Sequence, residues 1–503
     1  MAVQVNGSMQ AIALGDGYAL RAAGFRGQVD SPAVGLAGSR AGTRSSTAAP
    51  LPLDEALRAA DVTEVRRFEL QLQPIPGAAP AGALRGGGGT DLELDVPDRP
   101  GEGQIVLSVD DAGGMRWHLP EPAPVSVAGA SRSLGVKRFR IPAVPLAAAP
   151  DDGLRRDRSL LGMVGRRALR VLVYPLADPI VGALGKGIAH HWESGKRPHR
   201  LRSFTPENHA SADASRLDGT DIAAMAAAGR ILLFVHGTFS TSHAAFGGLP
   251  RATLASLHER YGGRVVAFDH PTLATDPREN VAWLLSQWPA APTTLDIVCH
   301  SRGGLVSRVL AEQPPAFELD ASHIDVQRMV LAGVPNKGTL LADPERMVDM
   351  VDRLTTVLNL FPTGPTAETL EALVTVIKVL GHGMLTGLEG LASMCPQGEF
   401  LRRLNSSAAP SSDYYGIASN YQPTDRGLRA LLSRAADAVA DKVFDNASND
   451  LVVPTDGVFE QNGSGRFPLP PERRMCFEPS DGVMHTALFE QPRVSEHLLA
   501  WLA

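Results

Sequence analysis

One stretch constrains this chain more than any other: residues 295–308 have the pattern of a buried strand, a tight turn and a helix. The run 297–299 is β-branched or apolar, as expected of a strand that is covered on both faces. Apolar residues recur at helical spacing after Gly304. Ser301 lies at the corner, where small flanking residues allow a sharp strand-to-helix turn that presents a hydroxyl outward. The stretch therefore predicts a nucleophile elbow.

The usual elbow pattern is Gly-x-Ser-x-Gly, whereas residues 299–303 here read Cys-His-Ser-Arg-Gly. Cys299 therefore stands where the pattern has its first glycine. A cysteine is small enough for that position, but the same letters also fit an ordinary strand-to-helix turn. Other motifs in the sequence are needed to distinguish a nucleophile elbow from an ordinary turn.

Composition excludes several other classes of protein. The 503 residues leave room for more than one domain, and a net charge of -6 argues against general nucleic-acid binding. The three cysteines are far apart, which indicates neither a disulfide framework nor a zinc site and fits a reducing compartment. The first residues lack the pattern of a secretory signal, and no apolar run has membrane-spanning length. We therefore expect a cytoplasmic protein.

The N-terminal part of the chain divides by composition into three segments. Residues 1–60 are rich in Gly, Ala, Ser and Pro, which predicts a poorly ordered segment. Residues 61–150 carry short alternating runs separated by turn residues, which predicts a small antiparallel β domain with the architecture of a sandwich. We expect this domain to be a structural or partner-binding module, and its partner is unknown. Residues 151–228 are both basic and apolar, and we predict a helical connector.

The connector allows two interpretations. Basic residues far outnumber acidic ones over 155–202, and apolar residues accompany them. A helix of this kind could lie on an anionic membrane surface, which would make the protein peripherally membrane-associated. The alternative, which we favour, is a pair of linker helices packed against the following domain, because apolar helix faces are usually part of a core.

From residue 229 to 503 strands alternate with helices, which predicts an α/β domain with a mostly parallel sheet. The alternation stops over about 344–410, where apolar residues recur at helical spacing. An insertion at this point lies over the ends of the strands, so it is a candidate cap or lid. Gly381, Gly383, Gly387 and Gly390 would give it mobility. The alternative interpretation is additional core.

A serine hydroxyl needs a base to take its proton and an acid to orient that base. In a sheet of this kind the expected order along the chain is serine, acid, histidine. Asp450 follows a predicted strand and His485 follows the last one, so both should face Ser301 from the same edge of the sheet. Asp445 and Asp343 are the alternative acids.

The first strand of this domain ends in His236-Gly237-Thr238. A glycine after this strand lets the backbone turn an N–H toward a developing oxyanion. We expect that donor to be the Thr238 N–H, with the Arg302 N–H as its partner.

Taken together, the motifs VHGTF, CHSRGG, AGVPNKGT, NDLVVP and VMHTALF resemble the bacterial lipase-like α/β-hydrolases, akin to triacylglycerol lipases and lipid-anchor deacylases. The resemblance covers about 230–503. It implies an α/β-hydrolase fold and hydrolysis of acyl or lipid esters through an acyl-serine intermediate, without a cofactor. It also implies Ser301 as nucleophile, Asp450 as acid and His485 as base. The alternatives are a thioesterase or peptidase with the same triad, and a catalytically silent fold that acts as a scaffold.

Overall fold

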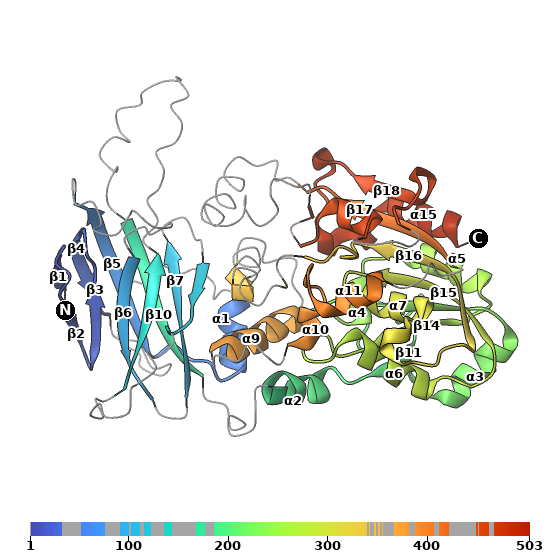
Figure 1. The fold of residues 1–503 in the computed structure, drawn as a ribbon, viewed down its shortest axis with the longest axis horizontal. Helices are drawn as coiled ribbons and strands as arrows, with labels where there is room; N and C mark the ends of the chain where they lie inside the picture. Colours follow the sequence, from blue (N-terminus) through green and yellow to red (C-terminus); the bar gives the residue numbers. More distant parts are fainter. Residues whose placement is uncertain are drawn as a thin grey trace, which may run out of the picture. The chain divides into compact units, whose positions relative to one another are not determined.

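The computed structural model divides into two compact units, one comprising 1–182, 351–365 and 377–384 and the other 183–350, 366–376 and 385–503 (Figure 1). The residues that the structure describes are 2–32, 52–75, 91–99, 102–110, 115–121, 135–142, 167–176, 186–339, 342, 347–348, 351–352, 355, 367–381, 388–406, 412–421, 449–450, 452–461 and 467–502.

The first unit consists of two antiparallel sheets and the helix α1 (Pro52–Ala59). A six-stranded sheet has the order β1-β4-β5-β10-β7-β8, and a four-stranded sheet has the order β2-β3-β6-β9. The strands are β1 (Val3–Asn6), β2 (Ile12–Gly15), β3 (Tyr18–Arg21), β4 (Phe25–Asp30), β5 (Arg66–Pro74), β6 (Asp91–Pro97), β7 (Gly103–Asp110), β8 (Met115–His118), β9 (Val136–Pro142) and β10 (Arg167–Leu176).

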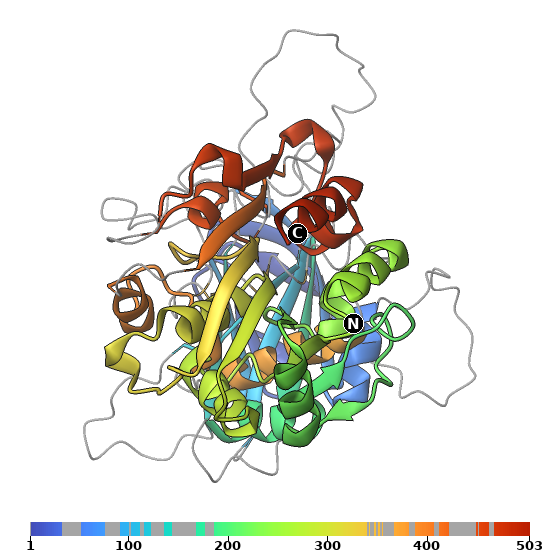
Figure 2. The same cartoon turned by 90° about the vertical axis from the view of Figure 1, so that its right-hand side faces the viewer.

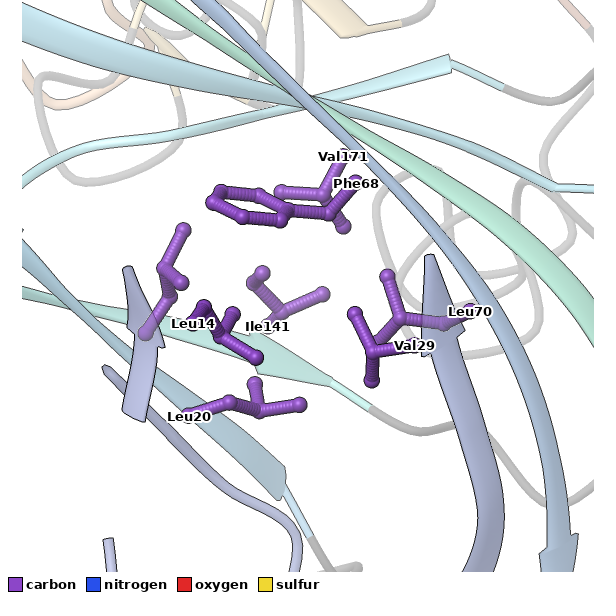
Figure 3. A pocket seen from close by; sticks show the side chains of 8 residues that line it. Leu14, Leu20, Val29, Phe68, Leu70, Ile141 and Val171 are labelled. Atoms are coloured by element: carbon purple, nitrogen blue, oxygen red, sulfur yellow. The ribbon is translucent and has the colours of Figure 1, made fainter. Parts of the chain in front are cut away.

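The two sheets enclose an apolar core, as the alternating sequence of their strands requires. In β5, buried Phe68, Leu70 and Leu72 alternate with exposed polar residues. Apolar side chains from both sheets meet in one cluster, and the space that remains between them has no room for a water molecule (Figure 3). The side chains that line it are Leu14, Leu20, Val29, Phe68, Leu70, Leu94, Ile141 and Val171. The sandwich predicted for 61–150 is therefore present, with wider limits.

Two predictions for the N-terminal half are wrong. Residues 3–30 carry the strands β1 to β4 and are not poorly ordered; of the segment 1–60, Met1 and 33–51 lie outside the described residues. The connector contributes β10, a strand between β5 and β7, where a helix was predicted. Tyr174 and Val173 are both buried although they point to opposite faces. A strand covered on both faces has a continuous apolar run, which periodicity cannot distinguish from a helix.

This strand changes what the basic connector can do. The apolar residues of 171–174 are buried in the first unit, so they form no membrane-facing helix. Of the rest of 155–202, residues 155–166 and 177–185 lie outside the described residues, and α2 (Lys186–Lys196) is the helix that the structure describes there. Among the described residues no helix is both long and apolar enough to cross a membrane.

The second unit is built on an eight-stranded sheet of order β12-β11-β14-β13-β15-β16-β17-β18. The strands from β14 to β18 in this order are parallel to one another, and β11 and β12 are antiparallel additions at one edge. The mostly parallel sheet is thus confirmed, but the domain begins before residue 229. The strands are β11 (Arg200–Ser203), β12 (Arg216–Leu217), β13 (Ile231–Val235), β14 (Val265–Asp269), β15 (Thr293–His300), β16 (Ile324–Ala332), β17 (Asp413–Ser419) and β18 (Arg474–Phe477).

Helices cover both faces of this sheet (Figure 2). One face packs against α5 and α15 through an apolar cluster that includes Leu254 and Leu498. The helices of this unit, besides α2, are α3 (Gly219–Ala228), α4 (Ser242–Phe246), α5 (Arg251–Arg260), α6 (Pro277–Gln287), α7 (Gly303–Glu312), α10 (Glu389–Ala392), α11 (Glu399–Asn405), α14 (Thr455–Phe459) and α15 (Pro492–Trp501), with short 3-10 helices η1 (Pro315–Phe317), η4 (Pro471–Arg473), η5 (Pro479–Asp481) and η6 (His485–Glu490).

The predicted cap does not form one body. Residues 351–365 belong to the first unit, where the Trp117 indole N–H donates to Thr355 Oγ1 at 3.0 Å. The buried helix α9 (Ala367–Gly381) contributes to both units, and 388–406 belongs to the second. A Cβ on Gly390 would collide with the Thr272 carbonyl, and one on Gly381 with Leu176. These two glycines therefore allow close packing, in contrast to the predicted role in mobility; Gly383 and Gly387 lie outside the described residues.

Candidate active site

Ser301 occupies the corner between β15 and α7, as predicted. Its φ is +53°, a left-handed conformation that is uncommon for a residue other than glycine and is a hallmark of strained functional turns. The corner is held in place because the Ser301 N–H donates to Ala332 O at 2.9 Å. The neighbouring Gly303 is required by close packing, since a Cβ there would collide with the carbonyls at the end of β13.

Cys299 fits the position where glycine is usual because its small side chain is accommodated in the core. It is fully buried, and its thiol donates to Val330 O at 3.3 Å on the neighbouring strand. Burial raises the pKa of this thiol to about 12, so it stays protonated. The departure from the usual motif thus leaves the corner intact.

Asp450 and His485 form a buried hydrogen-bonded pair. The distance from His485 Nδ1 to Asp450 Oδ2 is 2.7 Å, and both residues are at most 6% exposed. The other carboxylate oxygen accepts the N–H groups of Val452 and Val453 at 3.0 and 2.7 Å. These bonds fix the carboxylate, and because His485 faces it with Nδ1, the His485 Nε2 is left for another partner.

The structure brings this pair to the end of the sheet where Ser301 lies. Gly333, the residue after the Ser301-bonded Ala332, has a φ of +58°, and a Cβ there would lie 2.9 Å from His485 Cε1. Within the described residues no hydrogen bond joins Ser301 Oγ to the His485 ring. In enzymes without substrate, such catalytic bonds are often long and tighten only in the complex.

The predicted oxyanion loop lies directly against the serine. A Cβ on Gly237 would be 2.5 Å from Ser301 Cβ, so only glycine fits there. His236 accepts the His270 N–H at Nε2 (3.1 Å), and its Nδ1 is 2.9 Å from Gly237 O, to which it must donate. Since the Gly237 carbonyl and the Thr238 N–H belong to one peptide, this bond also fixes the direction of the Thr238 N–H.

The Arg302 N–H lies at the start of α7, where the first amide groups of a helix have no partner within the helix. Its side chain is fully buried: Nε donates to Gly390 O at 2.7 Å, and the guanidinium also donates to Thr275 O. Burial lowers its pKa to about 10, while the nearby Glu193 carboxylate acts in the opposite direction. Arg302 therefore fixes the segment 388–406 to the corner.

Glu193 on α2 stabilises the loop 272–274, next to the Thr275 carbonyl that Arg302 binds. Its carboxylate accepts the main-chain N–H groups of Leu273 and Ala274 at 2.7 and 2.9 Å and also that of Thr272. Burial, the largest influence, raises the pKa of this carboxyl. Sequence reasoning missed the contacts of Glu193 and of the Arg302 side chain, because they join residues far apart in the chain. An acidic residue in an otherwise basic segment was the available signal.

Neither of the alternative acids, Asp445 and Asp343, lies among the described residues. Within the described part of the chain, no three His, Cys, Asp or Glu side chains converge as a metal site would require.

The sequence matches the family described as "Domain of unknown function (DUF7379)" over residues 196–503, more than half of the chain. The chain belongs to this family. The match begins at the end of α2, close to the start of the second unit. No curated protein matches the sequence.

Several solved structures are similar to this chain. Phospholipase PlaB from Legionella pneumophila is 14% identical, covers 46% of this chain and has a TM-score of 0.29; only 45% of that protein is covered. Lipase 1 from Pelosinus fermentans is 14% identical over 53% of this chain and 94% of its own, with a TM-score of 0.33. An esterase from Pyrococcus furiosus is 12% identical over 62% and 93%, with a TM-score of 0.27.

Proposed function

We propose that this protein is a lipase-like α/β-hydrolase that cleaves carboxylic esters through an acyl-serine intermediate. The observation that carries the proposal is the placement of three features at one edge of the sheet: the strained Ser301 corner, the buried Asp450–His485 pair and the Gly237 loop packed on the serine. Each feature is common alone, but a serine hydrolase needs all of them together.

In the proposed mechanism His485 Nε2 takes the Ser301 proton as Oγ attacks the ester carbonyl carbon. Asp450 holds the ring through Nδ1–H and stabilises the imidazolium that forms. The imidazolium then gives its proton to the leaving alcohol, which leaves the acyl group on Ser301. Water, deprotonated by His485, then attacks the acyl carbon, and the imidazolium returns the proton to Ser301 Oγ as the acid leaves. The N–H groups of Thr238 and Arg302 stabilise the oxyanion, and each is expected to contribute about 10²- to 10³-fold in rate.

The proposed substrates are lipids or other esters with an apolar acyl group. The segment 388–406, fixed to the corner by Arg302, carries the buried apolar residues Leu388, Leu391 and Met394. Met394 Sδ lies 3.8 Å from Thr238 Oγ1, so an apolar side chain borders the proposed oxyanion site. This supports an apolar acyl group over a charged one.

The first experiment is labelling with a fluorophosphonate, which requires an activated serine and no knowledge of the substrate. We expect the wild type to be labelled and the Ser301→Ala and His485→Ala variants to remain unlabelled. Hydrolysis of esters, thioesters and peptides of increasing acyl length then assigns the substrate class. A maximum at long-chain esters supports the lipid proposal, whereas activity confined to short esters, thioesters or peptides contradicts it. A folded wild type that stays unlabelled with detergent or lipid present would indicate a silent fold with a scaffold role.

A further inference from the structure

A second histidine lies next to the nucleophile, and the proposed mechanism does not use it. His300 is the last residue of β15 and is 7% exposed. Within the described residues its Nδ1 is buried without a hydrogen-bond partner. An unpartnered buried nitrogen costs free energy that an aliphatic side chain at the same place would avoid. Packing alone therefore does not account for a histidine here.

The other ring nitrogen of His300 contacts the proposed base. Its Nε2 is 3.1 Å from the main-chain oxygen of His485, and because a carbonyl oxygen can only accept, Nε2 must carry the proton. The two imidazole rings also touch, with centroids 4.7 Å apart. The Phe489 ring packs against His300 nearly at a right angle, with the two ring centroids 5.8 Å apart.

These contacts complete the attachment of His485. Its N–H donates to Asp450 O at 3.3 Å, and its Nδ1 bonds Asp450 Oδ2 at 2.7 Å, so both of these bonds tie the base to the loop of the acid. The bond from His300 ties the same residue to the strand of the nucleophile. Because His300 directly precedes Ser301, it links the two groups between which the proton must move.

We propose that His300 is a positioning residue whose Nε2–H bond and ring contact set the separation between Ser301 Oγ and the His485 ring. This inference rests on the proposed function. A displacement of about 1 Å between reacting groups can cost about 10²-fold in rate. Burial lowers the pKa of His300 to about 3, so this histidine stays neutral and places no second positive charge beside the imidazolium.

The test compares three variants with the wild type by ester hydrolysis, by the rate of fluorophosphonate labelling and by thermal melting. His300→Leu removes the donor, and we expect kcat and the labelling rate to fall about 10²-fold with KM unchanged. His300→Gln offers an amide N–H of similar reach, and we expect it to recover to within about tenfold of the wild type. If His300→Leu does not fold, His300→Asn, whose amide is too short to reach, replaces it.

His209→Leu is the matched control. His209 is also 7% exposed, its Nε2 is 2.9 Å from Leu249 O, its Nδ1 is unpartnered and it lies edge-on to Phe204. Because both Leu variants remove a donor to a buried main-chain oxygen, we expect His209→Leu to change thermal stability as His300→Leu does, but to keep the wild-type kcat.

The outcomes separate the two proposals. A folded wild type that is not labelled overturns the proposed function and this inference with it. If the wild type is labelled and His300→Leu is labelled at the same rate, only the positioning role of His300 is overturned. If kcat falls equally in His300→Gln and His300→Leu, the positioning role is also contradicted, because the N–H of the glutamine amide is expected to restore the rate.

Discussion

The core of the first unit is a cluster of apolar side chains between two antiparallel sheets, whereas buried histidines lie at one edge of the sheet of the second unit. His236, His270 and His300 lie at the ends of β13, β14 and β15, and His485 begins η6 in the segment after β18; all four are at most 7% exposed. Burial lowers the pKa of His236 to about 4 and that of His270 well below its usual value. In the first unit, His118 is the one histidine that the structure describes.

The two units therefore differ in how their buried side chains are stabilised. Apolar burial stabilises a fold without directional demands, while each buried imidazole loses hydration and must be held by specific partners. At the second sheet's edge those partners are main-chain groups and carboxylates that also fix the orientation of the rings. The buried side chains of the first unit are those of an apolar core, and those at the sheet edge of the second unit suit the proposed proton transfer.

The largest expected effect comes from Asp450→Asn. An amide cannot hold the His485 Nδ1–H as the carboxylate does, so the ring loses the tautomer that leaves Nε2 free to accept a proton. We expect kcat for ester hydrolysis to fall about 10⁴-fold while KM changes little. The control is Asp296→Asn, a fully buried aspartate of β15 bound to Tyr261 and to the Arg328 N–H. If both variants lose kcat equally, loss of a buried charge and not triad geometry is responsible.

The second prediction concerns the scaffold. Phe68 is 1% exposed and packs edge-on against Tyr18 at 5.5 Å. Phe68→Ala leaves a cavity in the apolar core, and we expect the free energy of unfolding of the first unit to fall by about 3–5 kcal/mol. Because every proposed catalytic residue belongs to the second unit, kcat/KM of the folded protein should stay within about twofold of the wild type. A larger loss of activity would mean that the sandwich supports the site.

The sequence allowed the sheet edge to be predicted because its signals are local. The buried strand before Ser301, the small residues after it and the serine, acid, histidine order are properties of short segments. Parallel strands end at one edge, so the order alone implied that Asp450 and His485 lie near each other, as the 2.7 Å hydrogen bond between them confirms.

What could not be predicted depends on contacts between distant segments. The run around Val173 fits a helix or a central strand equally well until its neighbours in the sheet are known. The Arg302 bond to Gly390 spans 88 positions and the His300 bond to His485 spans 185, and no local pattern marks such pairs. The short strands β1 to β4 were missed because each has only 4 to 6 residues and glycine-containing turns separate them.

The last prediction concerns the one buried histidine that the structure describes in the sandwich. His118 Nε2 lies 2.8 Å from Ser108 Oγ, and burial, with the cationic Arg116 nearby, lowers its pKa to about 3. Its folded pKa lies below the unfolded value of about 6.5, so the unfolded chain binds the extra proton between these values. The stability is complete above about pH 6.5 and is lost as the pH falls toward about 3, by up to about 1.4 kcal/mol per pH unit.

Hydrogen exchange of the β7 and β8 amides measures this loss locally, apart from the acid titration of the second unit. In the double variant Ser108→Ala, His118→Leu both polar partners are replaced by apolar groups, which keeps the pair free of an unsatisfied donor. We expect the protection of these amides to depend on pH less steeply in the double variant than in the wild type, by the contribution of one bound proton, about 1.4 kcal/mol per pH unit. An unchanged slope would show that His118 is not the group that titrates, and the contrast between an apolar scaffold and a titrating edge would then be sharper than proposed.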